Sequence, residues 1–254
     1  MKKLIIVLLA MVLYATSGLS QRRKNTTEVK WLSIALKGGY GGTVMFNTDV
    51  MSDGKVTLNF LSPSYSYGGR FGITYGDHIG INYEPLFSGF GQEYNINDDV
   101  QPYAKNQRFT AFDNLLSLRY ISNYGFYFEA GPQFSKLKSA SVENDKTGNF
   151  TDGGEDYLSN FSENYTSLVA GLGFAAHNGD RLQVNIGLRG TYTFGNLVAN
   201  PNYYVLDDGV YQPAGGPFTS TTNPFTLKLM VEVNYFFGFW GDATCGRGRL
   251  MFFQ

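Results

Sequence analysis

The sequence lacks several features on which many secreted, catalytic and nucleic-acid-binding proteins depend. Cys245 is the single cysteine, so no intramolecular disulfide can form and a disulfide-stapled scaffold is excluded. His78 and His177 are the only histidines. Lys and Arg number 20 against 21 Asp and Glu, and the basic residues are scattered along the chain, so nucleic acid is not an expected partner.

Long apolar runs are also missing beyond the N-terminus. Leu4–Leu13 is apolar and follows two lysines, but a transmembrane helix needs about 20 such residues. Small residues and then the polar Gln21 come next, an order typical of a cleaved secretory signal. We predict a signal peptide over residues 1–20, removed on export through the inner membrane, and a short periplasmic segment over 21–30.

The mature chain shows apolar residues that alternate with polar ones at a period of two. In the clearest case, Leu182, Val184, Ile186 and Leu188 share one face of the segment 181–194. The segment is longer than ten residues, which fits a transmembrane strand of about 9–11 residues. The pattern recurs in eight segments: 31–40, 65–75, 79–88, 112–120, 126–135, 168–176, 181–194 and 225–239.

The connections between these segments alternate in length. Three are short and carry turn residues: 76–78, 121–124 and 177–180. Four are long and polar: 41–64, 92–107, 139–164 and 195–224. We therefore predict an all-β fold, an eight-stranded antiparallel up-and-down transmembrane β-barrel over 31–239, with short periplasmic turns and long extracellular loops. Residues 240–254 form a C-terminal tail.

Two prolines inside the predicted strands, Pro85 and Pro132, oppose this scheme. Each removes one donor from the strand ladder, and a closed barrel has no edge at which to place it. A strand end or a bulge would accommodate them more easily.

The faces opposite the apolar ones carry charges of both signs, which a narrow barrel would collect in its lumen. The cationic members are Lys37, Arg70, Arg119, Arg181, Arg189 and Lys228, and the acidic members are Glu84, Asp113, Glu129 and Glu232. We expect a network of ion pairs that fills the lumen, because isolated charges there would be costly to desolvate. An eight-stranded barrel is filled by its own side chains, which argues against a general diffusion pore.

The residue types of an active site are scarce. Enzymes of the outer membrane commonly use a histidine paired with a serine or an acid, whereas both histidines here fall in predicted periplasmic turns. We therefore predict no enzyme, no catalytic residues and no cofactor. Acidic loop clusters at 98–99, 152–156 and 207–208 lack the fixed spacing of a calcium loop, so no metal site is predicted.

The region from Leu115 to Leu137 resembles the PorT-type outer-membrane β-barrel family of Bacteroidota. Leu118-Arg119-Tyr120 precedes the turn, and the run from Phe128 to Gln133, with its Gly-Pro pair, follows it. The resemblance implies the barrel fold and an outer-membrane location, and the namesake of the family is associated with the type IX secretion apparatus. It implies no catalytic residues. The tail after Phe239 departs from the expected end at the last aromatic residue of the final strand.

Three functions are compatible with these features of the sequence. The first is a structural or interaction platform whose partners are outer-membrane lipid and other envelope proteins, a secretion-system accessory being one case. The others are a small channel or transporter and an envelope lipid hydrolase. We expect a monomeric barrel. The structural alternative is a soluble lipocalin-like barrel, which would have an apolar lumen and a polar exterior.

Overall fold

The computed structural model describes residues 29–75, 78–97, 102–144, 150–151, 158–179, 181–199, 220–241 and 249–251. Within them, eight long strands follow one another with antiparallel neighbours: β1 (Val29–Phe46), β3 (Ser62–Tyr75), β4 (Ile79–Ile96), β5 (Tyr103–Ile121), β6 (Phe126–Asn144), β8 (Asn164–Asn178), β9 (Leu182–Phe194) and β10 (Asn223–Gly241). The last strand pairs with the first, which closes the sheet into a barrel.

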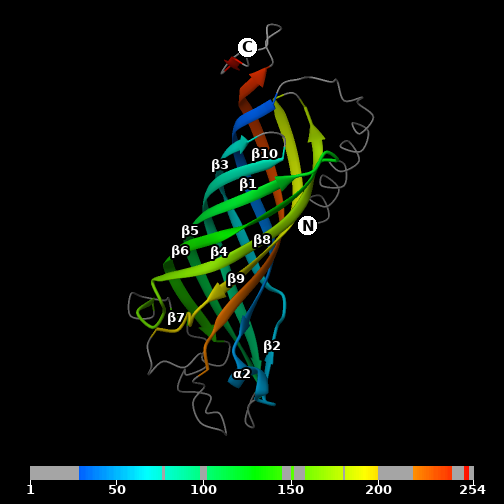
Figure 1. Ribbon diagram of the computed structural model, residues 1–254. Coiled ribbons are helices and arrows are strands. Elements are labelled where there is room, and N and C mark those ends of the chain that lie inside the picture. Colours follow the sequence, from blue (N-terminus) through cyan, green and yellow to red (C-terminus); the bar gives the residue numbers. More distant parts are fainter. Residues whose placement is uncertain are drawn as a thin grey trace.

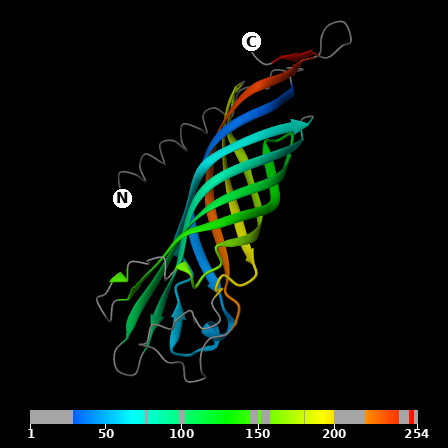
Figure 2. The same ribbon diagram turned by 90° about the vertical axis from the view of Figure 1, so that its left-hand side faces the viewer.

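The closing seam is long. β1 pairs with β10 from Val29↔Trp240 to Phe46↔Asn223, so the two ends of the barrel sequence are joined along the whole wall. The strands are tilted against the barrel axis, as Figures 1 and 2 show from two sides. This is the predicted eight-stranded up-and-down barrel.

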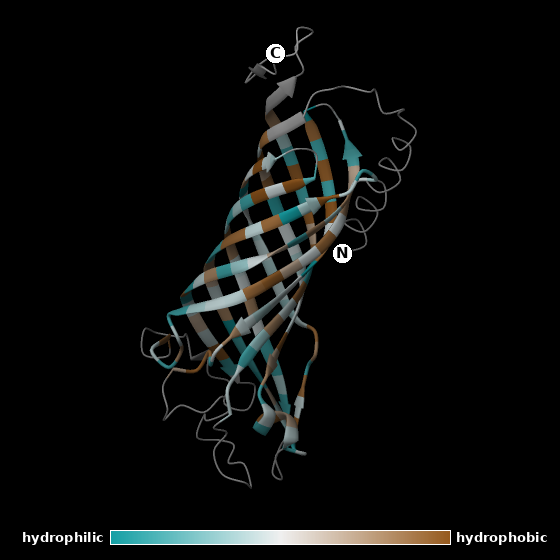
Figure 3. Cartoon of the chain, viewed as in Figure 1, coloured by the Kyte–Doolittle hydropathy of each residue, from teal (hydrophilic) through white to brown (hydrophobic). Residues whose placement is uncertain are grey.

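Alternation sorts the side chains between the two faces of the wall. Leu118, Phe128 and Leu172 point outward with exposed fractions of 61%, 59% and 53%, whereas their strand neighbours Arg119 and Glu129 are buried inside. Figure 3 shows apolar and polar residues following each other along the strands. An apolar exterior over a charged interior suits a lipid surrounding, and it is the reverse of a lipocalin-like barrel. The barrel is therefore transmembrane.

No helix among the described residues is long and apolar enough to cross a membrane.

Several strands are longer than predicted. β1 continues to Phe46, β4 reaches Ile96, and β5 begins at Tyr103, so parts of the expected loops 41–64 and 92–107 are strand. Likewise β6 runs on to Asn144, beyond the expected loop start at 139. The long connections lie at the end of the barrel that carries these longer strands. We call this end, with its strand ends and connections, the extracellular extension. The short turns lie at the opposite, periplasmic end.

Each in-strand proline interrupts one ladder and leaves the other intact. Pairing of β3 with β4 skips from Gly68↔Leu86 to Phe71↔Tyr83, while Pro85 still pairs with Asn114 of β5. In an antiparallel sheet both backbone groups of a residue point to the same neighbour, so a proline withdraws a donor from one side only. Pro85 therefore lies inside β4 without breaking the sheet, and the predicted strand is confirmed.

Pro132 repeats the arrangement. Pairing of β5 with β6 skips from Leu115↔Gln133 to Leu118↔Ala130, and the ladder to β8 continues through Pro132↔Leu168. A glycine accompanies each gap. A Cβ on Gly68 would collide with the Pro85 carbonyl oxygen, and a Cβ on Gly131 would collide with the Leu116 carbonyl oxygen. The missing side chains let the backbones approach closely where the ladder is irregular.

Four short elements complete the described structure. The helix α2 (Thr48–Ser52) and β2 (Val56–Leu58) lie in the first extracellular connection, and β7 (Phe150–Thr151) pairs with β6. At the opposite end of the barrel, β11 (Arg249–Met251) pairs with the last residues of β10 (Figure 1). Part of the predicted tail thus extends the sheet. The predicted signal peptide and residues 21–28 lie outside the described residues.

Candidate functional site: the closed lumen

Seven charged side chains meet inside the barrel, one from each of seven strands: Lys37 (β1), Arg70 (β3), Glu84 (β4), Arg119 (β5), Glu129 (β6), Arg189 (β9) and Glu232 (β10). All seven belong to the predicted lumen charges, and each is at most 5% exposed. We call these seven residues the ion cluster. Inward alternation from every side of a narrow barrel is what brings residues nearly 200 positions apart into contact.

Lys37 lies among three carboxylates. Its Nζ is 3.1 Å from Glu84 Oε1, 3.4 Å from Glu129 Oε1 and 3.1 Å from Glu232 Oε2. Lys37 and Glu232 are also cross-strand partners at the β1–β10 seam. The ammonium group therefore joins the closing strands to two strands on other parts of the wall.

Arg119 forms two-pronged contacts with two carboxylates. Its Nη1 and Nη2 donate to Glu232 Oε1 and Oε2, both at 2.8 Å. Its Nε and Nη2 donate to Glu129 Oε2 at 3.2 and 2.7 Å. Such bidentate charged hydrogen bonds fix the direction of the planar guanidinium group as well as its position. Glu129 is in addition the cross-strand partner of Arg119.

Arg189 connects the remaining carboxylate. Its Nη1 is 2.8 Å from Glu84 Oε2, its Nε donates to Glu129 Oε1 at 2.9 Å, and its Nη2 also contacts Glu129 Oε1. β8, the one long strand without a charge in the cluster, contributes Gly171, which pairs with both Glu129 and Arg189. A Cβ there would approach Glu129 Cγ to 2.9 Å, so this glycine leaves room for the carboxylate.

Arg70 is bound differently from the other cations. Its Nη1 lies 3.7 Å from Glu232 Oε1, beyond hydrogen-bond distance. Its hydrogen bonds go to neutral groups: Nη1 donates to Asn82 Oδ1 at 3.0 Å, and Nη2 donates to Ser33 Oγ at 3.2 Å and to Asn234 Oδ1.

The other predicted lumen charges lie outside the ion cluster. Asp113 and Lys228 are buried in the lumen and attract each other electrostatically. The prediction is wrong for Arg181, which was expected in the lumen but lies half-buried in the turn before β9.

The lumen is further filled on one side of the ion cluster by Tyr127. Arg119 Cζ lies 4.4 Å from the centre of the Tyr127 ring, which favours a cation–π contact. Gly173 and Gly187 lie beside the same ring. A Cβ on Gly173 would come within 2.6 Å of its Cζ, so small residues are needed there.

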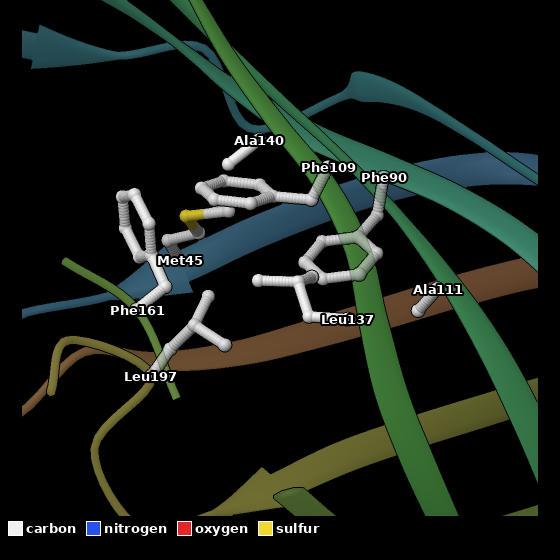
Figure 4. Packing of buried hydrophobic residues seen from close by; sticks show 8 residues of the cluster. All are labelled: Met45, Phe90, Phe109, Ala111, Leu137, Ala140, Phe161 and Leu197. Carbon is white, nitrogen blue, oxygen red and sulfur yellow. The ribbon is translucent and has the colours of Figure 1, made fainter. Parts of the chain in front are cut away.

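An apolar cluster fills the barrel at the extracellular extension. Figure 4 shows its members, which come from strands and loops alike: Met45, Phe90, Phe109, Ala111, Leu137, Ala140, Phe161 and Leu197. The ring of Phe109 stacks on Phe90 at 5.3 Å and meets Phe161 edge-on at 4.8 Å. We call this cluster the apolar cap. It occupies the lumen at a second level, separate from the ion cluster.

Extracellular connections supply part of the apolar cap and are tied to one another. Phe161 precedes β8 and Leu197 follows β9, and Ser162 N donates to Leu197 O at 2.8 Å. A second apolar cluster (Val50, Val56, Leu58, Tyr94, Ile96 and Tyr103) packs α2 and β2 against the extended β4 and β5. Ser220, before β10, donates to Asp49 of α2 from its backbone N at 2.8 Å and from its Oγ at 2.5 Å.

The two histidines lie at the periplasmic end of the barrel, far from the extracellular extension. His78 Nδ1 is 2.8 Å from Ile121 O, and its ring stacks on Tyr120. His177 belongs to the end of β8 and not to the turn in which it was predicted, because the strand continues to Asn178. In the described part of the chain, no group of three or more His, Cys, Asp or Glu residues could hold a metal ion. The predicted acidic clusters 98–99 and 207–208, like 152–156, lie outside that part.

Comparisons with known proteins give structural likenesses only. No protein-family model matches the chain, and no curated protein matches it. Among solved structures, the chain is similar to the outer membrane protein OprG of Pseudomonas aeruginosa, with 11% identity, a TM-score of 0.40 and coverage of 83% of this chain and 97% of OprG. It is also similar to the attachment invasion locus protein Ail of Yersinia pestis (11%, 0.37, 82% and 100%) and to Neisserial surface protein A (9%, 0.37, 81% and 97%).

With TM-scores below 0.5, these likenesses carry no argument of their own. The closed barrel and its apolar exterior are what assign the chain to the outer-membrane β-barrels, since such barrels are the sheet structures that span a membrane. The narrower resemblance to the PorT-type family stays a prediction.

Proposed function

We propose that the chain is a non-enzymatic interaction platform of the outer membrane, and that its extracellular extension is the surface it offers to other envelope proteins. A secretion-system accessory is the case that the PorT-type resemblance suggests. One observation carries the proposal: the lumen is filled at two levels, by the ion cluster and by the apolar cap. A barrel closed twice is poorly suited to conduct solutes, so its role is sought on the outside.

The build of the extracellular extension supports this assignment. Strands β4 and β5 pair without interruption from Ile79↔Tyr120 to Ile96↔Tyr103. α2, β2 and parts of two further connections pack at this end of the barrel. Loops that surround an open pore have no need of a packed core of their own. A rigid support that holds loop segments in place is common where binding residues are carried on loops.

Site-specific photocrosslinking in cells tests the platform. A photoreactive residue replaces Arg108, which is 70% exposed on the extracellular extension, and in a matched strain it replaces Tyr124, 89% exposed in a periplasmic turn. We expect discrete crosslinked envelope proteins from position 108. Crosslinks from position 124 alone would contradict the proposal.

Planar-bilayer recordings of the purified barrel test the closed lumen directly. We expect no stepwise conductance from the wild-type protein. Steady channel openings would favour a small channel instead and would overturn the platform.

A further inference from the structure

The charges of the ion cluster do not balance. Lys37, Arg70, Arg119 and Arg189 are four cations, and Glu84, Glu129 and Glu232 are three carboxylates, which leaves one positive charge in excess. Asp113 and Lys228 are of opposite sign and do not change this difference. A buried charge without a counter-charge is costly, and an arginine cannot lose its proton in a protein.

Arg70 is the cation without a hydrogen-bonded carboxylate. Lys37, Arg119 and Arg189 each have a carboxylate oxygen within 3.1 Å, whereas the nearest one to Arg70 lies at 3.7 Å. Arg70 is also the most exposed member of the cluster, at 5%. The excess charge is therefore located on Arg70.

The groups around Arg70 leave donors free. A guanidinium group only donates, so the side chains of Asn82 and Asn234 turn their oxygens to it. Their NH₂ groups consequently point elsewhere. Asn82 Nδ2, Asn234 Nδ2 and Arg70 Nε are all buried and have no hydrogen-bond partner among the described residues.

The three free groups share one property. Unpartnered hydroxyls elsewhere in the lumen, such as Ser117 Oγ and Thr226 Oγ1, can donate and accept and so suit water. The three groups at Arg70 can only donate. The backbone of β3 runs close beside these groups at Gly72, since a Cβ there would approach Asn82 Oδ1 to 2.7 Å and Ser33 Oγ to 2.8 Å. Donor-only groups on β3, β4 and β10, carried by an unpaired cation and by the two amides bonded to it, are chemically complementary to an anion.

We propose that the lumen binds one small anion, such as chloride, phosphate or a carboxylate, beside Arg70, with Asn82 and Asn234 as further donors. The anion neutralises the ion cluster and stabilises the closed barrel. This site is independent of the proposed platform, because it lies in the lumen of the barrel and not on the extracellular extension.

The test uses the full mature barrel, folded in a non-ionic detergent. Its unfolding midpoint is measured in sodium chloride, phosphate or acetate against sodium gluconate, whose anion is the largest of the four, at equal ionic strength. We expect at least one of the small anions to raise the midpoint by about 5 °C, the scale of ligand binding near 100-fold above Kd. The same midpoint in all four salts would overturn the proposal.

Three variants locate the effect. Arg70→Gln removes the excess charge and should abolish the anion dependence, while Arg108→Gln, the same change at an exposed arginine, should retain it. Asn82→Asp supplies an internal carboxylate to Arg70. We expect this variant to unfold in gluconate at or above the wild-type midpoint in the best small anion, with no further gain from that anion.

Asn82→Asp also guards against a failure of Arg70→Gln to fold. A folded Asn82→Asp barrel that still responds to the anion as the wild type does would contradict the assignment to Arg70. The excess line width of ³⁵Cl NMR gives a binding readout independent of stability. If chloride is among the anions that raise the midpoint, the excess line width should be present in the wild type and in Arg108→Gln, and absent in Asn82→Asp.

Discussion

The membrane belt, the part of the wall whose outward side chains are apolar, and the extracellular extension are parts of the same strands. The belt buries the ion cluster, whereas the extension buries the apolar cap. In the belt, Glu129 of β6 points inward and Phe128 points to lipid. In the extension, Phe109 of β5 points inward and its neighbour Arg108 is exposed to water. The surroundings of the wall decide which face is apolar, and the interior takes the complement. β5 changes in this way while its inward positions stay in phase along the strand.

The two regions also hold themselves together differently. The ion cluster depends on mutual pairing of charges, and loss of one partner leaves another charge buried and uncompensated. The apolar cap depends on contact area, and loss of a side chain costs in proportion to the space left behind. Four substitutions test this contrast, in order of falling effect.

The largest effect is expected from Glu129→Gln. Glu129 contacts Lys37, Arg119 and Arg189, so its neutralisation leaves three buried cations with less compensation. We expect a loss of about 3–5 kcal/mol in the free energy of unfolding, measured by urea titration in lipid vesicles. Glu163→Gln, which breaks an exposed pair with Lys136, should cost less than about 1 kcal/mol. Equal losses would show that burial of the cluster has no energetic consequence.

The next effect concerns the outer surface. Leu172→Arg places a charge on the lipid-facing side of β8 and should cost about 2–4 kcal/mol, because the charge loses its hydration in the bilayer. Asn95→Arg makes the corresponding change on the water-facing side of β4 in the extension, where we expect almost no change. The same urea titration compares them. Similar costs at both sites would place the extension inside the membrane.

A smaller effect is expected in the apolar cap. Phe109→Leu removes ring contacts with Phe90 and Phe161 and should cost about 1.5 kcal/mol. It should also loosen the connection that carries Phe161, since that ring loses its edge-on partner. Limited proteolysis of whole cells should then cut this connection faster than in the wild type. An unchanged cutting rate would mean that the cap does not hold the connection.

The smallest effect is expected from Ser220→Ala. It removes the side-chain hydrogen bonds to Asp49 and from the exposed Thr48 hydroxyl, and it leaves the backbone one to Asp49, so we expect a loss of about 1 kcal/mol or less. Hydrogen exchange of the α2 amides should report it as faster local opening, with the barrel amides unchanged. Faster exchange throughout the barrel would assign this contact a global role.

Alternation in the sequence was enough to predict the barrel, because the belt strands carry apolar residues such as Leu182 and Leu188 at strict intervals of two. It also predicted ten inward charges, of which nine are buried in the lumen, the seven members of the ion cluster among them, while Arg181 lies half-buried in a turn. Their partners could not be predicted, since the register of eight strands decides which charges meet. The special position of Arg70, for example, arises from Asn82 and Asn234 on two other strands.

The extracellular extension was missed for a physical reason. Phe90, Tyr94 and Phe109 continue the alternation beyond the belt, but there the apolar side chains point inward and the polar ones outward. A pattern of apolar outward faces therefore does not include these residues, and they were predicted to lie in polar loops. Phe161 and Leu197 were missed because they lie in connections with no period at all. The prolines counted against the predicted strands without displacing them. The structure shows the reason that the strands hold, since each proline disturbs one ladder only.

The seam between β1 and β10 has a consequence for how the barrel assembles. Every other neighbouring pair of long strands is also consecutive among those strands, and so can form early as a hairpin, whereas Lys37 and Glu232 meet only when the first and last strands join. Until then the sheet is open, and Glu232 lacks one of its cations while Lys37 lacks one of its carboxylates. Contacts so distant in sequence form slowly because the chain loses much entropy in reaching them. Closure of the wall and completion of the ion cluster are therefore one late, cooperative step. A barrel that has not closed would still carry unpaired charges.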